Sequence, residues 1–179
     1  MSLSVIENSV EGLQNPIANS HNSYEIYKQQ VIASSTAQEI LKSLEQSSKV
    51  VGILLIDEEY DSMYIPPFLL ENGPVNKFDG GIAVVNITSQ MKIENTDIPI
   101  GVSLMHELGH AKQYIENPTG FETKYKEAMG EQKTNYPSEL TKQKKGKKIS
   151  QLVIENENVA LHEAPVCHEL GLPYRKRYD

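Results

Sequence analysis

Residues 98–115 read IPIGVSLMHELGHAKQYI, and this stretch decides the fold. Apolar residues recur within it at helical spacing: Leu104, Leu108, Ala111 and Ile115. This stripe predicts an amphipathic helix that packs against a sheet. His106 and His110 lie four residues apart, so both imidazoles point to the same side of that helix. Gly109 costs about 1 kcal/mol relative to Ala in a helix, which indicates that another segment approaches closely there.

The spacing of His106, Glu107 and His110 suits a metal-dependent hydrolase. Two neutral imidazoles four residues apart can share one Zn²⁺ and leave room for a third ligand and a water. Glu107 lies beside His106 around the helix, where its carboxylate can take a proton from that water and later deliver it to a leaving amine. The sequence therefore predicts hydrolysis of a peptide bond with Glu107 as the general base.

The third ligand is less constrained by the sequence. The extended zincin pattern needs Gly and His where this chain has Gln113 and Glu116, so that class is excluded. Glu163 lies at helical spacing from three apolar residues, Val159, Val166 and Leu170. A carboxylate on such an inward face should be paired or bound to metal. Glu155 and Glu157 are the nearby alternatives. His162 and His168 could also be ligands, but lone histidines beside a helix are more often surface residues.

Composition narrows the classes of protein that fit. The chain has 179 residues, enough for one ordinary domain, and 39% of them are hydrophobic. A formal net charge of −7 argues against a protein built to bind nucleic acid. A single Cys excludes a disulfide framework and a cysteine-based zinc finger. No apolar run approaches the roughly 18 residues that span a bilayer.

The rest of the chain predicts an α+β domain with a small mixed sheet. The predicted elements are a strand or short helix at 24–32, helices at 35–47 and 156–170, and strands at 50–56, 82–87 and 149–154. Residues 117–148 give no clear assignment. Residues 1–23 are polar and lack a basic start and an apolar stretch, so we expect a flexible leader without a classical signal peptide, followed by one domain over 24–179. We expect the active-site cleft between the 98–115 helix and a sheet edge near Gly80–Ile87, where an extended substrate could add as a strand.

Three segments resemble the NleD-like zinc metallopeptidases, a family of type III secreted bacterial effectors. They are GGIAVVN (Gly80–Asn86), LMHELGHA (Leu104–Ala111) and HEAPVCHELGLPYRKRY (His162–Tyr178). The second is typical of zincins in general, and the third is similar to the family's C-terminal pattern of Glu-Leu-Gly-Leu-Pro followed by Arg and Tyr.

The resemblance implies a zincin-like fold in which the zinc-binding helix packs with a C-terminal helix. It implies one catalytic Zn²⁺ held by His106, His110 and Glu163, with Glu107 as the base. Arg175 and Tyr178 fall on the family's Arg and Tyr, whose chemistry suits stabilising an oxyanion or orienting substrate.

Two further observations bear on this assignment. Tyr114, one turn beyond His110, is a second candidate for oxyanion stabilisation. Ala164 and Pro165 depart from the family pattern, and Pro165 removes a helix hydrogen bond, which predicts a kink or a helix start near Glu163.

The resemblance also implies a biological setting. Family members enter the host-cell cytoplasm and cut signalling proteins, the familiar substrates being stress-activated MAP kinases. By that resemblance the partner is a protein substrate, with no nucleic acid and no membrane, and we expect a monomer.

The sequence is also compatible with three other functions. A catalytically weak zincin could bind a host protein without cutting it. The lysine-rich segment 142–148 could contact nucleic acid, which would make binding salt-sensitive. Cys167 with His162 or His168 could form a cysteine hydrolase.

Overall fold

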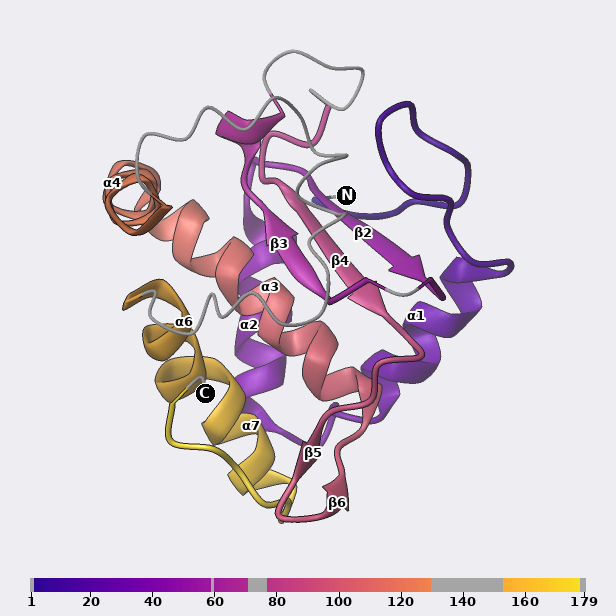
Figure 1. Ribbon diagram of the computed structural model, residues 1–179, viewed down its shortest axis with the longest axis vertical. Helices are drawn as coiled ribbons and strands as arrows, with labels where there is room; N and C mark the ends of the chain where they lie inside the picture. Colours follow the sequence, from indigo (N-terminus) through magenta and orange to yellow (C-terminus); the bar gives the residue numbers. More distant parts are fainter. Residues whose placement is uncertain (1, 59, 71–76, 130–152, 178–179) are drawn as a thin grey trace.

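The computed structural model describes residues 2–58, 60–70, 77–129 and 153–177. Its centre is a four-stranded sheet in the order β1-β2-β4-β3, in which β1, β2 and β4 are parallel and β3 is antiparallel to β4 (Figure 1). The strands span Leu3–Val5 (β1), Val51–Ile56 (β2), Met63–Ile65 (β3) and Ile82–Asn86 (β4). A separate hairpin joins β5 (Lys92–Ile93) to β6 (Thr96–Asp97).

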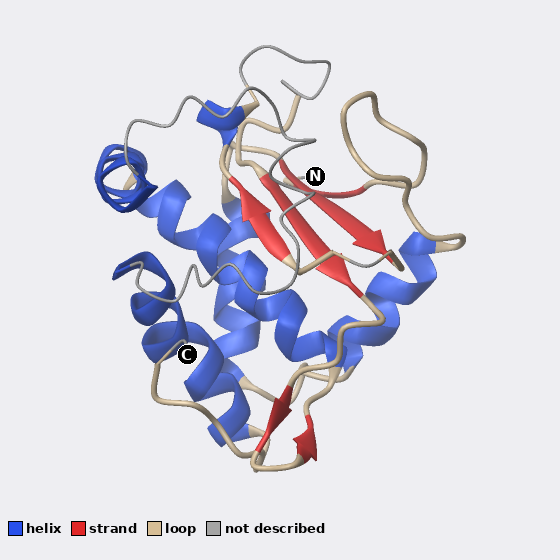
Figure 2. Ribbon diagram, in the orientation of Figure 1, coloured by secondary structure: helices blue, strands red, loops and turns tan. Residues whose placement is uncertain are grey.

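Helices make up most of the remaining described structure. They are α1 (Ser20–Gln29), α2 (Ser35–Gln46), the short 3₁₀ turn η1 (Pro67–Leu69), α3 (Ile100–Glu116), α4 (Pro118–Met129), α6 (Val153–Asn158), the π-helical η2 (Val159–Glu163) and α7 (Ala164–Glu169). The predicted mixed α+β class, with a small sheet against helices, is confirmed (Figure 2).

Both faces of the sheet are covered, although by different kinds of structure. One face packs against α1, α2 and α3 and forms the larger core, which includes Ile53, Leu55 and Val85. The opposite face, with Leu54, Ile56 and Val84, packs against residues such as Ile6 and Phe78 from outside the regular sheet strands. Burial on both faces explains why β2 and β4 read as continuous apolar runs rather than alternating ones.

The strongly patterned elements match their predictions. The 98–115 helix is α3, the 35–47 helix is α2, and the strands at 50–56 and 82–87 are β2 and β4. Helix α2 is capped by Ser34, whose hydroxyl accepts a hydrogen bond from the Ala37 N–H at 3.0 Å. The ambiguous segment 24–32 contributes most of α1.

The predicted flexible leader over residues 1–23 is wrong. Strand β1 pairs in parallel with β2, and the Ile6 N–H donates to the Ile53 carbonyl at 2.9 Å. The Ile6 side chain is only 5% exposed. The domain therefore does not start at residue 24, because the polar composition of this segment conceals a short strand that completes the sheet.

The C-terminal part differs from its prediction in two ways. Residues Val153 and Ile154, expected at the end of a strand, begin α6, and the rest of the predicted 149–154 strand lies outside the described residues. Helix α4 was not predicted, because its sequence is polar and Gly-containing.

The kink expected at Pro165 takes the form of the π turn η2, in which the Ala164 N–H donates to the Val159 carbonyl. Pro165 has no N–H, and the wider turn accommodates that loss while the helix continues.

The expected substrate edge near Gly80–Ile87 is also wrong. Strand β4 lies between β2 and β3, so both of its edges are already hydrogen-bonded. Among the described strands, β3 lies at that margin of the sheet (Figure 1).

Within the described ranges, no helix combines the length and apolar character that crossing a membrane requires.

Candidate metal centre

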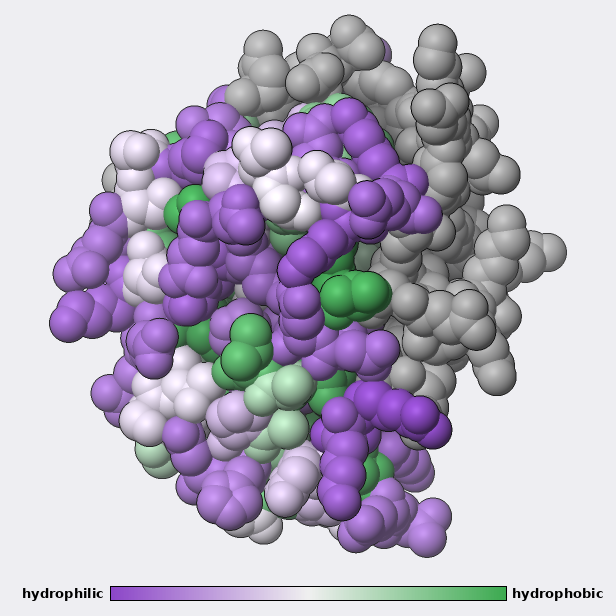
Figure 3. Space-filling model, turned by 90° about the vertical axis from the view of Figure 1, so that its left-hand side faces the viewer, coloured by the Kyte–Doolittle hydropathy of each residue, from purple (hydrophilic) through white to green (hydrophobic). Residues whose placement is uncertain are grey.

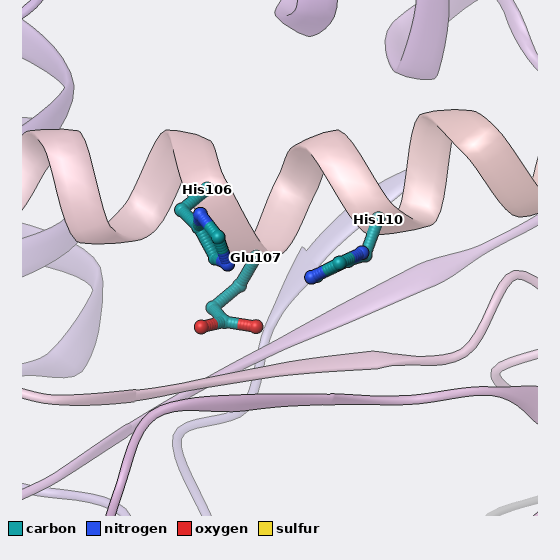
Figure 4. Close-up of side chains that lie close together, drawn as sticks. All are labelled: His106, Glu107 and His110. Carbon is teal, nitrogen blue, oxygen red and sulfur yellow. The ribbon is translucent and has the colours of Figure 1, made fainter. Parts of the chain in front are cut away.

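Helix α3 carries three side chains that converge on one point. His106, Glu107 and His110 extend from the same side of the helix, and the Glu107 carboxylate lies farther from the helix than the two imidazoles (Figure 4). One ligand atom from each of the three lies within 4.8 Å of the others. All three residues are buried, with 5%, 5% and 3% exposure respectively. This is the grouping that the sequence spacing predicted.

A second carboxylate comes from α6. Oε2 of Glu155 lies 3.2 Å from Nε2 of His106 and 3.2 Å from Nε2 of His110. One carboxylate oxygen therefore faces the Nε2 atoms of both histidines. Two imidazole nitrogens and one carboxylate oxygen form the ligand set of a typical catalytic zinc site.

Glu163 occupies a different position from the one that the resemblance implied. Its Oε2 lies 2.7 Å from Nδ1 of His106, on the opposite side of the ring from Nε2. Arg175 holds the same carboxylate with two hydrogen bonds, Nε to Oε1 at 2.6 Å and Nη2 to Oε2 at 2.7 Å. The assignment of Glu163 as third ligand therefore does not fit this geometry, in which Glu155 is the carboxylate that faces both Nε2 atoms. The prediction that an inward carboxylate would be paired does hold, since Glu163 is fully buried and paired with Arg175.

His110 has a neutral partner instead of a carboxylate. Its Nδ1 lies 3.0 Å from Oε1 of Gln113, one turn further along α3. The Gln113 amide nitrogen lies 3.4 Å from the Ile154 carbonyl oxygen, directly before Glu155 in the chain. Each of the two imidazoles thus has a partner on the nitrogen that faces away from Glu155.

Close contact between α3 and the C-terminal helices depends on Gly109. A Cβ at this position would lie 2.3 Å from Oδ1 of Asn158 and 2.9 Å from Nδ1 of His162. Asn158 is fully buried and donates through Nδ2 to the His106 carbonyl at 2.8 Å, while its Oδ1 is 2.7 Å from Nδ1 of His162. The close approach predicted from Gly109 is confirmed, and it lets α6 bring Glu155 to the histidines.

Aromatic side chains on the sheet side of the site were missed by the sequence analysis. Tyr64, on edge strand β3, stacks on His110 with ring centroids 6.3 Å apart and donates its hydroxyl to the Gly80 carbonyl at 2.7 Å. Phe121 of α4 meets the edge of Tyr64, and Tyr125 stacks on Phe121. No motif marks these residues, because their proximity depends on how β3 and α4 pack beside α3.

The carboxylates strongly perturb the ionisation of the site. Burial by itself lowers the pKa of His106. The hydrogen bonds that the Glu155 and Glu163 carboxylates accept from this imidazole outweigh burial and raise its pKa to about 10. Burial raises the pKa of Glu107 to about 7, although His106 and His110 act in the opposite direction. For Glu163, burial is outweighed by His106 and Arg175, which lower its pKa to about 2. Groups with such shifts in one cluster are typical of functional sites.

The charge of the cluster fits a divalent cation. When ionised, Glu107, Glu155 and Glu163 carry three negative charges, and Arg175 supplies one positive charge beside them. A bound divalent ion would bring this sum to zero. Without such an ion, a proton on His106 compensates part of the charge, as its raised pKa indicates. Imidazole and carboxylate donors in this number fit Zn²⁺.

The other candidates from the sequence lie away from this point or outside the described residues. Tyr178 lies outside them. Arg175 engages Glu163 through Nε and Nη2, which is a supporting position rather than the oxyanion role expected for it. Glu157 pairs with Lys124 at 2.7 Å, and Tyr114 packs edge-on against Phe121.

The histidines and cysteine near the C-terminus do not form a second site. His162 is buried against Asn158, contrary to the expectation of a surface residue, and burial lowers its pKa to about 4. His168 is exposed beside Tyr174. Cys167 is fully buried, and burial raises its pKa to about 11, which is the opposite of what a thiolate nucleophile requires. The lysine-rich segment 142–148 lies outside the described residues.

One signal in the sequence could have identified Glu155. The inward stripe that includes Val159 and Glu163 continues at four-residue spacing to Glu155, one turn earlier. Because the predicted strand ran over 149–154, the predicted helix began only at residue 156, just after Glu155, so this turn was not counted.

No protein-family model, no curated protein and no solved structure matches this chain.

Proposed function

We propose that this protein is a zinc-dependent endopeptidase with a zincin-like fold. The observation that carries the proposal is the position of Glu155 Oε2, 3.2 Å from Nε2 of both His106 and His110, beside Glu107. Three protein ligands from two helices leave a fourth position for water or substrate.

The chemistry divides between the metal and Glu107. Zinc, when bound, acts as a Lewis acid that polarises a carbonyl and makes water nucleophilic near neutral pH. Glu107 accepts the proton from the attacking water on its carboxylate and delivers it to the leaving amine nitrogen. Burial raises the pKa of Glu107 to about 7 in the metal-free protein, and a bound Zn²⁺ would lower that pKa and favour the ionised form that a general base requires.

The substrate would be an extended segment of protein chain. Strand β3 lies at the margin of the described sheet, and its Tyr64 stacks on His110, so a peptide added along β3 would pass beside the metal ligands. This replaces β4 as the docking strand. The resemblance to NleD-like effectors extends the proposal to host signalling proteins such as MAP kinases, reached by secretion into the host cytoplasm.

The direct test is proteolysis by the wild type and by Glu107→Gln, each loaded with one equivalent of Zn²⁺. A mixture of unfolded proteins serves as substrate, and mass spectrometry identifies new chain ends. We expect cleavage by the wild type and a loss of at least about 100-fold in Glu107→Gln, in line with removal of a general base. The matched control is Glu116→Gln, which alters an exposed carboxylate on the same helix and should cleave like the wild type.

Each other result has a defined meaning. Full activity in Glu107→Gln would contradict the mechanism. A wild type that binds zinc but cleaves nothing, including MAP kinases, would favour the alternative of a catalytically weak zincin that binds a host protein. Failure to bind zinc would contradict the proposal altogether.

A further inference from the structure

Gln113 connects two parts of the candidate metal centre. Its Oε1 lies 3.0 Å from Nδ1 of His110, and its Nε2 lies 3.4 Å from the carbonyl oxygen of Ile154. It is partly buried, on α3, while Ile154 is on α6. A single side chain therefore contacts one proposed ligand and the residue next to another.

The chemistry of the amide fixes the direction of both contacts. The Ile154 carbonyl can only accept, so the Gln113 nitrogen must face it and donate. The Gln113 oxygen then faces His110 and can only accept, which requires the proton of the imidazole to be on Nδ1. The lone pair of His110 is thereby placed on Nε2, the atom 3.2 Å from Glu155.

The two histidines consequently have unlike partners. Nδ1 of His106 faces the Glu163 carboxylate, which Arg175 holds in place, whereas Nδ1 of His110 faces a neutral amide. A carboxylate makes its imidazole more basic, and a neutral amide orients the ring with less effect on its charge. Gln113 also occupies the position where the extended zincin pattern requires glycine, so its presence distinguishes this chain from that class.

We propose that Gln113 is a positioning residue for the metal centre: it holds His110 in the tautomer that presents Nε2 and ties α6, next to Glu155, to the same turn of α3. This inference rests on the proposed metal site and assigns Gln113 no contact with substrate. Removal of such a partner of a ligand histidine typically weakens metal affinity by about 10- to 100-fold.

Two substitutions separate the parts of this role. Gln113→Leu keeps a side chain of similar size but has neither an acceptor for His110 nor a donor for Ile154. Gln113→Glu keeps an acceptor for His110, loses the donor for Ile154 and adds a negative charge. The matched control is Gln38→Leu, which removes a glutamine hydrogen bond to the Ile32 carbonyl, 2.6 Å long, at an exposed site on α2.

The measurement is the zinc dissociation constant by competition with a chromophoric chelator, which needs no substrate. We expect Gln113→Leu to bind zinc about 10- to 100-fold more weakly, Gln113→Glu to stay within about threefold of the wild type, and Gln38→Leu to be unchanged. The metal-free Gln113→Leu protein should unfold at a temperature close to that of the wild type.

Either of two results would overturn the proposal: Gln113→Leu binding zinc as tightly as the wild type, or Gln113→Glu losing as much affinity as Gln113→Leu. If Gln113→Leu does not fold, Gln113→Glu and the ¹⁵N shifts of His110 in the zinc-loaded wild type decide, since the proposal requires a protonated Nδ1. A wild type that binds no zinc would instead contradict the proposed function, so the two failures are distinguishable.

Discussion

At the scale of single residues, the partly exposed Glu155 and the fully buried Glu163 contact the histidines in different ways. Glu155 meets the Nε2 atoms of both histidines, and Glu163 meets only the Nδ1 atom of His106. A direct ligand contributes a bond to the metal, whereas a carboxylate behind an imidazole orients that ligand and increases its basicity. The structure therefore ranks the two residues by their expected effect on metal binding.

Substituting the two glutamates separately tests this ranking. Glu155→Gln should cost clearly more zinc affinity than Glu163→Gln, for which a loss of about 10- to 100-fold is expected from its indirect position. Zinc affinity by chelator competition measures both, and Glu157→Gln is the control because Glu157 pairs with Lys124 instead. The reverse order would restore Glu163 as the third ligand.

Glu163→Gln should also destabilise the fold, with or without metal. It leaves the Arg175 guanidinium without its buried carboxylate, and breaking a buried pair typically costs about 3–5 kcal/mol. Denaturant unfolding of the metal-free variants separates this stability effect from the effect on zinc affinity.

The ionisation of His106 makes zinc binding dependent on pH. Its pKa, raised to about 10 in the metal-free protein by Glu155 and Glu163, means that a proton must leave before Nε2 can bind zinc. Zinc affinity should therefore rise by about tenfold per pH unit between pH 6 and 8 for the one proton that is released. Calorimetry in buffers of different ionisation enthalpy counts that proton, and an affinity independent of pH would contradict the prediction.

The same shift has the opposite consequence for the metal-free fold. A histidine whose folded-state pKa exceeds the unfolded value of 6.5 contributes stability that is fully present below pH 6.5 and is lost as the pH rises through about 10. Both effects come from the same proton on His106: as the pH rises, zinc binding to the folded protein strengthens by the amount of stability that the metal-free fold loses.

At the scale of elements, the contact between α3 and η2 determines the shape of the site. Gly109 allows Asn158 and His162 to lie against the helix backbone, and Asn158 then bonds to the His106 carbonyl. Helix propensity alone would favour alanine at position 109 by about 1 kcal/mol. The packing around Gly109 predicts instead that alanine lowers the stability of the protein, so a substitution at this position distinguishes packing from helix propensity.

Gly109→Ala should destabilise the protein by about 1–3 kcal/mol, because its Cβ would lie 2.3 Å from Oδ1 of Asn158 and force the helices apart. It should also weaken zinc binding, since α6 carries Glu155. Urea unfolding and zinc titration measure the two effects. As a check, adding Asn158→Ala should make the double variant less unstable than the sum of the single changes, because the clash is then relieved. A stabilised Gly109→Ala protein would show that the contact is not tight.

The sequence predicted those elements whose own pattern determines their structure. β2 is apolar throughout, β4 is apolar up to its last residue, Asn86, and α3 carries a continuous stripe with Leu104 and Leu108, so the local pattern was sufficient. Helix α4 and strand β1 lack such a pattern and are held by partners distant in sequence, as the pairing of β1 with β2 shows. The histidines were identified because four-residue spacing on a helix brings them together. The choice between Glu155 and Glu163 depends on which ring nitrogen each carboxylate meets, and that follows from tertiary packing rather than from spacing.

At the scale of the whole molecule, the face drawn in Figure 3 offers no large apolar contact and favours recognition through the backbone. The described part of the face in Figure 3 is mainly hydrophilic, and its apolar residues form small separate patches. The net charge of −7 agrees with such a surface. Addition of a peptide to the edge of β3 requires no extended apolar patch, because main-chain hydrogen bonds supply much of the binding energy.

The N-terminal segment provides the sharpest test of the fold as a single unit. Strand β1 hydrogen-bonds to β2, the central parallel strand that also pairs with β4, and Ile6 packs in the same core cluster as Leu54 and Ile56. Truncating a buried isoleucine to alanine typically costs about 2–5 kcal/mol, and most domains are stable by only about 5–15 kcal/mol.

Deletion of residues 1–6 should therefore abolish or severely weaken cooperative unfolding, whereas Ile6→Ala should lower the free energy of unfolding by about 2–5 kcal/mol. Circular dichroism during urea titration measures both, and Glu11→Ala, at an exposed position of the same segment, should change stability by less than about 0.5 kcal/mol. If residues 1–23 were instead a flexible leader, the deletion would leave the unfolding curve unchanged. Because β2 leads into the core beneath α3, loss of β1 should also reduce zinc affinity, although β1 carries none of the proposed metal ligands. A deletion variant that binds zinc as tightly as the full chain would show that the metal centre is independent of this edge of the sheet.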